Sequence, residues 1–191
     1  EAEQQEPPGP LPLPDELVAA GQAPAEPAEP LPDLNESDER VLGRLAELEL
    51  GARLLRLITP EEVIRRFVVF TDNVARGSLP QMEYPVRRVE QDMVVEEVDD
   101  NLYVMQEASH DRFDPVVETL VNVDVDQAMS VYETFRPLFI EAYAELGYGE
   151  RDFDAVVLEA IDQVLAVEVP EGPYQLIRPS VMYEFADSSL E

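Results

Sequence analysis

The sequence predicts a mainly α fold, a compact helical bundle of about five to six helices with a small β-hairpin and an extended C-terminal segment. Two long segments carry apolar residues at three- and four-residue steps, which is the spacing of one helix face. Each of them follows an aspartate, a residue type that caps helices. A third observation is Thr59-Pro60-Glu61-Glu62, which has Pro at a first helical position and acids in a first turn.

The longest helical pattern follows Asp124. Asp124 and Gln127 resemble a capping box, and Gly147 suits a left-handed stop. Pro137 inside the pattern predicts a kink or two shorter helices in series. The residues expected to face the core are Ala128, Val131, Tyr132, Phe135, Leu138, Phe139, Ala142, Tyr143 and Leu146.

The second long pattern follows Asp152, and a short turn joins it to the first. We expect these two helices to form an antiparallel pair. Its predicted buried stripe is Phe153, Val156, Val157, Ala160, Ile161, Val164 and Leu165.

Three further helices are predicted. The first is capped by Asn35 or Ser37 and interrupted at Gly51. The next starts at Thr59-Pro60 and ends at Arg76-Gly77. The third starts at Asp114-Pro115, and its residues predicted to face inward are Val116, Val117, Leu120 and Val121.

Two short runs favour β structure. Residues 93–98 and 102–105 flank the turn residues Asp99-Asp100-Asn101, which predicts a hairpin. Near the C-terminus Val181, Tyr183 and Phe185 alternate with other residues, as in an extended segment. This segment is expected either to lie across the helices or to pair with the hairpin.

Composition divides the chain into a linker and one domain. Residues 1–32 hold nine of the 17 Pro and seven acidic residues with no basic one. Such a segment has too little apolar mass to offset chain entropy, so we predict a disordered Pro/Glu-rich linker over 1–32 and a single mostly helical domain over 33–191.

The charge restricts the partners. The net charge is -29, and all 13 basic residues are Arg. An acidic chain of this kind repels phosphates, which argues against nucleic acid and against anionic lipid surfaces as direct partners. With no Cys, the chain has no disulfide, thiol nucleophile or Cys-ligated metal.

No catalytic residue, cofactor or metal site is predicted. His110 is the single histidine, and its neighbour Ser109 suits a helix cap better than a triad. Asp33, Asn35 and Ser37 start like a calcium loop, but Asp38 stands where that loop needs Gly and Arg44 where it needs Glu.

The residues predicted to bind a partner are charged or aromatic. Arg178, Tyr183, Glu184 and Asp187 lie in an extended stretch that a compact core does not require, and Arg65, Asp72 and Arg112 follow them. Asp72 stands four residues before Arg76, so a helical ion pair also explains it.

Three segments together resemble an uncharacterised bacterial family classed as a domain of unknown function. They are TPEEVIRRFVVFTDNVARG, EAYAELGY and IRPSVMYEFAD. The resemblance implies an envelope protein with one N-terminal transmembrane helix, a Pro-rich linker and then this domain in the periplasm. It implies no activity.

The leading hypothesis is therefore a non-enzymatic periplasmic binding or scaffold domain, anchored to the inner membrane through an upstream segment, with an envelope protein as its partner. Two alternatives are open. One is a glycan-acting envelope hydrolase that uses an acidic pair. The other is a calcium-binding domain that uses the acidic turns.

Overall fold

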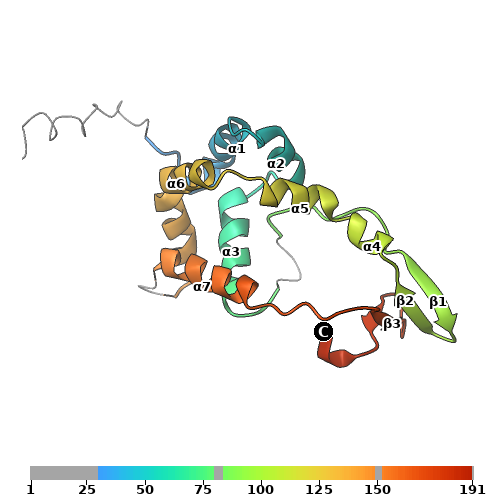
Figure 1. The fold of residues 1–191 in the computed structure, drawn as a ribbon. Helices are drawn as coiled ribbons and strands as arrows, with labels where there is room; N and C mark the ends of the chain where they lie inside the picture. The colour runs from blue at the N-terminus through green and yellow to red at the C-terminus, as the bar shows by residue number, and fades with distance from the viewer. Residues whose placement is uncertain (1–29, 80–83, 149–151, 191) are drawn as a thin grey trace, which may run out of the picture. The chain divides into compact units, whose positions relative to one another are not determined.

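The computed structural model describes residues 30–79, 84–148 and 152–190. The chain divides into two units, Glu1–Leu31 and Pro32–Glu191. The predicted linker lies almost wholly outside the described residues. The described part of the second unit has seven α-helices and a four-stranded sheet, so the predicted mainly α class is confirmed (Figure 1).

The elements follow one another along the second unit. The α-helices are α1 (Asp38–Ala46), α2 (Gly51–Leu57), α3 (Val63–Ala75), α4 (Ala108–Asp111), α5 (Asp114–Val121), α6 (Val125–Glu145) and α7 (Phe153–Leu165). The strands are β1 (Val95–Asp99), β2 (Leu102–Met105), β3 (Gln175–Ile177) and β4 (Glu184–Phe185). Short 3-10 turns, η2 (Leu34–Glu36) and η3 (Ser188–Leu190), flank them.

The sheet joins the predicted hairpin to the C-terminal segment. Its order is β1-β2-β3-β4, and all three pairs are antiparallel. The hairpin turn places Asn101 at a φ of 57°, a left-handed conformation that Asn tolerates. Leu176 of β3 stands opposite both Tyr103 and Phe185, and it is buried. The C-terminal part of the chain therefore pairs with the hairpin through β3, whereas the segment with alternating residues contributes only β4, which pairs with β3.

The helical core lies where α3, α6 and α7 meet. Val68, Phe135 and Val156, one from each helix, are at most 1% exposed. The predicted stripe of α6 faces this core, Asp124 accepts the backbone N–H of Gln127 at 2.8 Å, and Gly147 ends the helix at a φ of 82°. The helix runs on through Pro137 without division into two.

The predicted antiparallel pairing of α6 with α7 is only partly right. The side chain of Asp152 caps α7 as expected, at 3.1 Å from the backbone nitrogen of Asp154. The first turn of α7 meets α6, with the Phe153 ring centroid 5.3 Å from that of Tyr143. Most of α7, however, packs against α3. Helix α3 offers α7 a larger contact surface than α6 does. The short turn between α6 and α7 in the sequence does not indicate this contact.

The predicted start of α3 at Thr59-Pro60 is wrong by about three residues. The backbone N–H of Thr59 binds the carbonyl of Pro85 at 2.9 Å, and Ile58 forms a β-bridge with Val86, so this stretch is extended. The helix begins at Val63 after Glu62, which has a φ of 53°. Its cap comes from another helix.

Asp38 in the first turn of α1 caps α3 across the fold. Its two carboxylate oxygens accept the backbone N–H groups of Glu62 at 2.8 Å and Val63 at 2.9 Å. A carboxylate at this position satisfies two free donors and opposes the positive end of the helix dipole. Ser37, predicted as a cap, instead donates its hydroxyl to the carbonyl of Leu34 at 2.8 Å.

We expect Asp38→Ala to lower the free energy of unfolding by about 1 kcal/mol, because two helix donors lose their acceptor. Glu39→Ala removes the same charge from the same turn without removing a cap and is the matched control. Chemical denaturation of both variants measures the difference. Equal stability of the two variants would show that Asp38 acts only through its charge.

Candidate functional site

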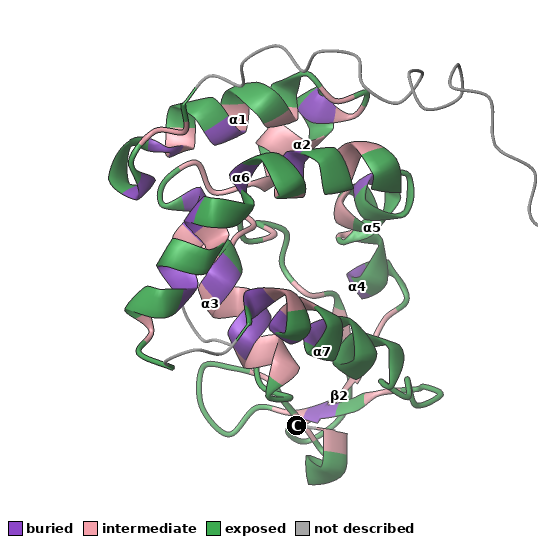
Figure 2. Ribbon diagram, turned by 90° about the vertical axis from the view of Figure 1, so that its left-hand side faces the viewer, coloured by how far each residue is buried: buried purple, intermediate pink, exposed green. Residues whose placement is uncertain are grey.

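The apolar stripe of α7 is buried on one side only. Phe153 and Val156 are at most 1% exposed, whereas Ile161 is 48% exposed, Val164 60% and Leu165 78%. The predicted burial of these last three residues is wrong. At about 100° per residue, Ile161 and Leu165 lie about 80° and 120° around the helix from Phe153, beyond the side that α3 and α6 cover. Val164 lies only about 20° from Phe153 but stands in the last turn of the helix. Figure 2 shows α7 with buried and exposed segments in alternation.

The predicted inward face of α5 is also largely exposed. Val117 is 53% exposed, Leu120 58% and Val121 73%, and only Val116 is half-buried. The buried residue of this helix is Thr119, whose hydroxyl donates to the carbonyl of Pro115 at 2.7 Å. A helix as short as α5 makes few contacts, so neighbouring elements cover only part of its apolar side.

The exposed face of α7 carries negative charge and no positive charge. Residues 152–177 contain six acidic residues and no Arg, Lys or His. Asp162, Glu168 and Glu171 are exposed, and none of them forms an ion pair with another residue that the structure describes. Val167 and Val169 extend the exposed apolar surface beyond the helix, at 67% and 78% exposure. We call Ile161, Val164, Leu165, Val167 and Val169 the α7 face.

A second feature is an apolar cavity of about 340 Å³. Helices α1, α2, α3, α5 and α6 contribute its walls, together with Pro85, Val86 and Val123. Of its 17 lining residues only Tyr132 carries a polar side-chain group. Ligand pockets in proteins have volumes of about 300–1,000 Å³ and predominantly apolar linings, so this cavity is of ligand-binding size.

An empty cavity of this size is costly. At about 24 cal/mol per Å³ it would cost on the order of 8 kcal/mol if it were closed and dry. That is comparable with the whole stability of an ordinary domain. Several of its walls are only half-buried, and Phe67 is 41% exposed, so solvent reaches the space.

The one polar group in the cavity wall is already engaged. The Tyr132 hydroxyl donates to Asp154 Oδ1 at 2.5 Å, and Arg136 Nε donates to Asp154 Oδ2 at 2.9 Å. Burial, together with the hydrogen bond to Asp154, raises the pKa of Tyr132. Hydrogen bonds from Arg136 and then from Tyr132 hold the pKa of Asp154 below its ordinary value. The side chains of the cavity wall therefore offer no free hydrogen-bonding group.

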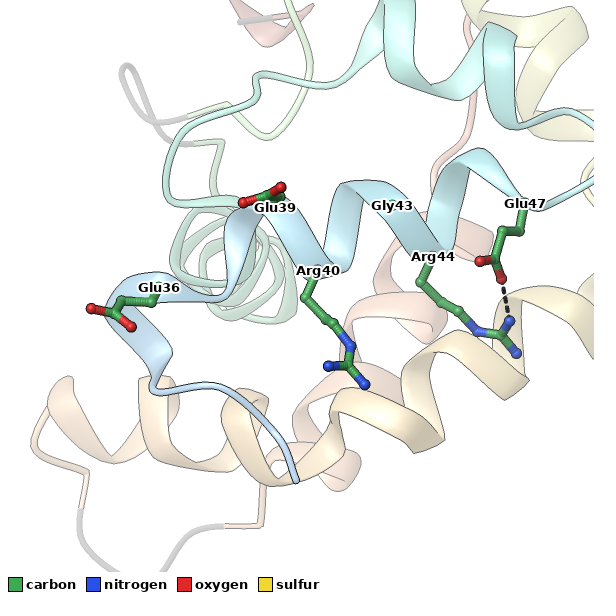
Figure 3. Close-up of a pocket in the computed structure, with 6 residues that line it drawn as sticks. All are labelled: Glu36, Glu39, Arg40, Gly43, Arg44 and Glu47. Atoms are coloured by element: carbon green, nitrogen blue, oxygen red, sulfur yellow. Dashed lines mark hydrogen bonds and ion pairs between the residues drawn. The ribbon is translucent and has the colours of Figure 1, made fainter. Parts of the chain in front are cut away.

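A third, open hollow lies on the outer side of α1. Glu36, Glu39, Arg40, Gly43, Arg44 and Glu47 line it. Figure 3 shows that the carboxylates are spread along one helix and the turn before it, and that Glu47 is paired with Arg44. An acid-pair hydrolase needs two carboxyl groups that flank one bond. A single helix face does not provide that arrangement.

Four of the predicted binding residues lie at the C-terminal strands. Arg178 stands over the Tyr183 ring at 5.2 Å from its centroid, and that ring meets Tyr103 edge-on at 5.1 Å. Glu184 is an exposed residue of β4. Asp187 accepts two hydrogen bonds from Ser189, which lower the pKa of its carboxyl group. The structure therefore brings Arg178 and Tyr183 together.

Arg65 and Asp72 lie on α3, where Arg65 connects the helix to other elements and Asp72 pairs within it. Arg65 donates to both carboxylate oxygens of Glu145, at 2.7 and 2.9 Å, and to Asn35 at 2.8 Å. Asp72 is 2% exposed and pairs with Arg76, which confirms the predicted helical ion pair.

Arg112 follows α4 and covers the Phe113 ring at 4.8 Å from its centroid. No hydrogen bond or ion pair between described residues joins Arg65, Asp72 or Arg112 to the four C-terminal residues. The role of all seven residues in binding stays a prediction.

The comparison with protein families finds one match. The model described as "Protein of unknown function (DUF3014)" matches residues 63–191. The chain belongs to the DUF3014 family. The match begins at the first residue of α3 and includes α7 and the sheet. No curated protein and no solved structure matches the chain.

Metal and membrane features are absent from the described part of this DUF3014 protein. Over 30–79, 84–148 and 152–190 no three His, Cys, Asp or Glu residues cluster as metal ligands would. None of the helices in these ranges has the length and apolar character needed to span a bilayer.

Ser109 of the DUF3014 domain is not a helix cap, contrary to the prediction. It lies inside α4, is 1% exposed and forms two hydrogen bonds with the backbone of Val94, at 2.7 and 2.6 Å. The His110 ring faces Tyr174 at 6.1 Å between centroids. Ser109 thus binds α4 to the residue directly before β1.

The Arg65–Glu145 pair of the DUF3014 domain predicts a pH dependence. The hydrogen bonds from Arg65 hold the pKa of Glu145 below its ordinary value. The stabilisation is therefore present above the unfolded-state pKa of about 4.3 and is lost as the pH falls through the lower folded-state pKa.

We expect Glu145→Gln to lower the melting temperature slightly at pH 7, and the difference from the wild type to shrink as the pH falls through the lowered pKa of Glu145. Glu133→Gln, exposed on the same helix, is the control for net charge. Melting curves of the three proteins from pH 7 to pH 3 measure the difference. A constant difference between wild type and Glu145→Gln over that range would contradict the role of the ion pair.

Proposed function

We propose that this DUF3014 domain is a non-enzymatic binding domain that holds a basic protein of the bacterial envelope on its α7 face. The observation that carries the proposal is the exposure of Ile161, Val164 and Leu165 on a helix that Phe153, Val156 and Ala160 anchor in the core. The buried side fixes the helix in place. The exposed side is therefore a rigid apolar surface that a partner can cover.

The number of exposed apolar residues in the α7 face supports a binding role. Single exposed apolar residues are ordinary, whereas contiguous apolar patches with a polar rim mark interaction sites. The α7 face consists of five aliphatic residues within nine positions of the chain, each at least 48% exposed. A helix that presents its apolar side in this way suits a groove or a second helix on the partner.

The negative charge around the α7 face favours a partner with a basic surface. Asp162, Glu168 and Glu171 border the α7 face, and residues 152–177 carry no positive charge. A partner with an apolar groove and a basic rim satisfies both features, and charge complementarity of this kind accelerates association. A second copy of the same chain would bring the same negative charges together.

The location of the partner rests on the resemblance described above. That resemblance implies a domain in the periplasm, on a Pro-rich spacer that follows an inner-membrane anchor. A Pro-rich segment of about 32 residues at about 3.1 Å per residue reaches up to about 100 Å from an anchor. The domain so displayed is placed to meet an envelope protein.

Crosslinked affinity capture from intact cells tests the proposal. The full-length protein, its Ile161→Arg variant and its Ala155→Arg variant are compared, and the segment 1–32 alone is the control for the linker. Ala155 is exposed on the same helix, about 120° around it from Ile161 at about 100° per residue. Arg at position 161 removes apolar contact and repels a basic partner.

The expected result is one protein with a basic surface, recovered with the wild type and with Ala155→Arg but lost with Ile161→Arg. Recovery of the same protein with all three forms would place the partner elsewhere on the domain. A partner that binds the segment 1–32 alone would contradict a binding role for the domain.

A further inference from the structure

The apolar cavity and two arginines beside it form a composite site. A smaller hollow of about 110 Å³ adjoins the cavity, and Leu57 lines both. Arg53 and Arg56 of α2 line the smaller hollow, opposite Pro115 of α5. Val116, the next residue along α5, lines the cavity itself.

The two arginines are available to a ligand. Both side chains are exposed, and neither forms an ion pair with a residue that the structure describes. They are three positions apart on one helix, so they lie on the same side of it. Glu118 also lines the smaller hollow, which leaves a net charge of about +1 there.

We propose that this site binds a single-chain amphipathic anion such as a free fatty acid. The proposal goes beyond the protein-binding role of the α7 face and does not depend on it. The aliphatic chain of the ligand enters the cavity, whose side chains offer no free hydrogen-bonding group. The carboxylate lies in the smaller hollow, where Arg53 and Arg56 donate to it.

The chemistry of the two hollows favours this ligand over others. A polar ligand would lose its hydrogen bonds with water in a cavity where the Tyr132 hydroxyl already binds Asp154. A cationic amphiphile would lack an acceptor for the arginines. A carboxylate with one aliphatic chain satisfies the apolar wall and the guanidinium groups at once.

Titration calorimetry of the full 191-residue chain tests the proposal. Dodecanoate is the probe, and dodecanol and dodecyltrimethylammonium are the neutral and cationic comparisons, all below their aggregation concentrations. We expect saturable binding of one dodecanoate per chain with a negative heat-capacity change, which marks burial of apolar surface. Each methylene added from octanoate to dodecanoate should raise the affinity about fourfold until the cavity is full.

Two pairs of variants distinguish the cavity, which holds the aliphatic chain of the ligand, from the two arginines, which hold its carboxylate. Ala128→Phe fills the cavity from α6, and Ala144→Phe places the same side chain on the exposed part of that helix. Arg53→Gln/Arg56→Gln removes the charges beside the cavity, and Arg40→Gln/Arg44→Gln removes two from α1. If Ala128→Phe does not fold, Val123→Phe fills the same cavity from the connection before α6.

The proposal predicts that the cavity-filling variant binds dodecanoate at least tenfold more weakly, whereas Ala144→Phe binds it as the wild type does. The double variant on α2 should weaken dodecanoate binding about tenfold and dodecanol binding less than twofold. No saturable binding to the folded wild type would overturn the proposal. So would equal binding by Ala128→Phe, or binding of the cationic amphiphile as tight as that of dodecanoate.

Discussion

Val156→Asp is expected to unfold the domain or to lower its free energy of unfolding by more than about 4 kcal/mol. Val156 is 0% exposed and faces α3 from α7. A carboxylate there would be buried without a partner. The same substitution five residues later, Ile161→Asp, lies on the exposed half of the helix and should change stability by less than about 0.5 kcal/mol.

Urea denaturation of the two variants tests whether α7 has one buried and one exposed side. The loss of helix propensity is nearly equal in the two variants, because each replaces a β-branched residue of α7 with Asp. A large loss of stability with Ile161→Asp would mean that the face is covered within the domain, and the proposed partner surface would then not exist. Stability retained in Val156→Asp would contradict the packing of α7 on α3.

Phe135→Ala is expected to lower the free energy of unfolding by about 3–5 kcal/mol. Phe135 is 1% exposed on α6, so its removal leaves a cavity inside the core of α3, α6 and α7. Phe113→Ala is the matched control, because Phe113 is 43% exposed and its ring is covered by the guanidinium of Arg112. We expect that control to cost less than about 1 kcal/mol.

Equilibrium denaturation of both phenylalanine variants measures the contrast. It also tests the prediction that truncation of the α6 stripe destabilises the fold. Similar losses for Phe135→Ala and Phe113→Ala would indicate that α6 does not supply the centre of the core.

Local signals predicted the helices well where their cause is local. The cap of α6 by Asp124, its stop at Gly147 and the cap of α7 by Asp152 depend on residues within one turn, and all three are present. The start of α3 was missed because its cap is Asp38, which is 25 residues before Val63 in the chain. A pattern read within a short window cannot contain such a contact.

The candidate site was less accessible to sequence reasoning. Periodicity shows which residues share a helix face, but it does not show how much of that face neighbouring elements cover. For α7 two signals were present in the sequence: an apolar stripe about twice the usual minimum width of about 100°, and the lack of any basic residue over 152–177. The cavity could not be predicted, because its wall combines side chains from five helices that are distant in sequence.

The predicted binding residues have structural contacts that sequence alone could only suggest. Arg65 and Tyr183 are predicted to bind a partner because one is charged and the other is aromatic. In the structure Arg65 joins α3 to Glu145 at the end of α6, and Tyr183 packs on Tyr103 of β2. A residue of either type serves architecture or binding, and only its surroundings distinguish the two roles.

Photocrosslinking from the α7 face tests the central claim most directly. A photoreactive amino acid replaces Ile161 in the full-length protein in intact cells, and a second form carries it in place of Ala155. The account predicts a crosslink from position 161 to one basic envelope protein, and little or none from position 155. Equal crosslinking from both positions, or a product that consists only of two copies of this chain, would contradict it.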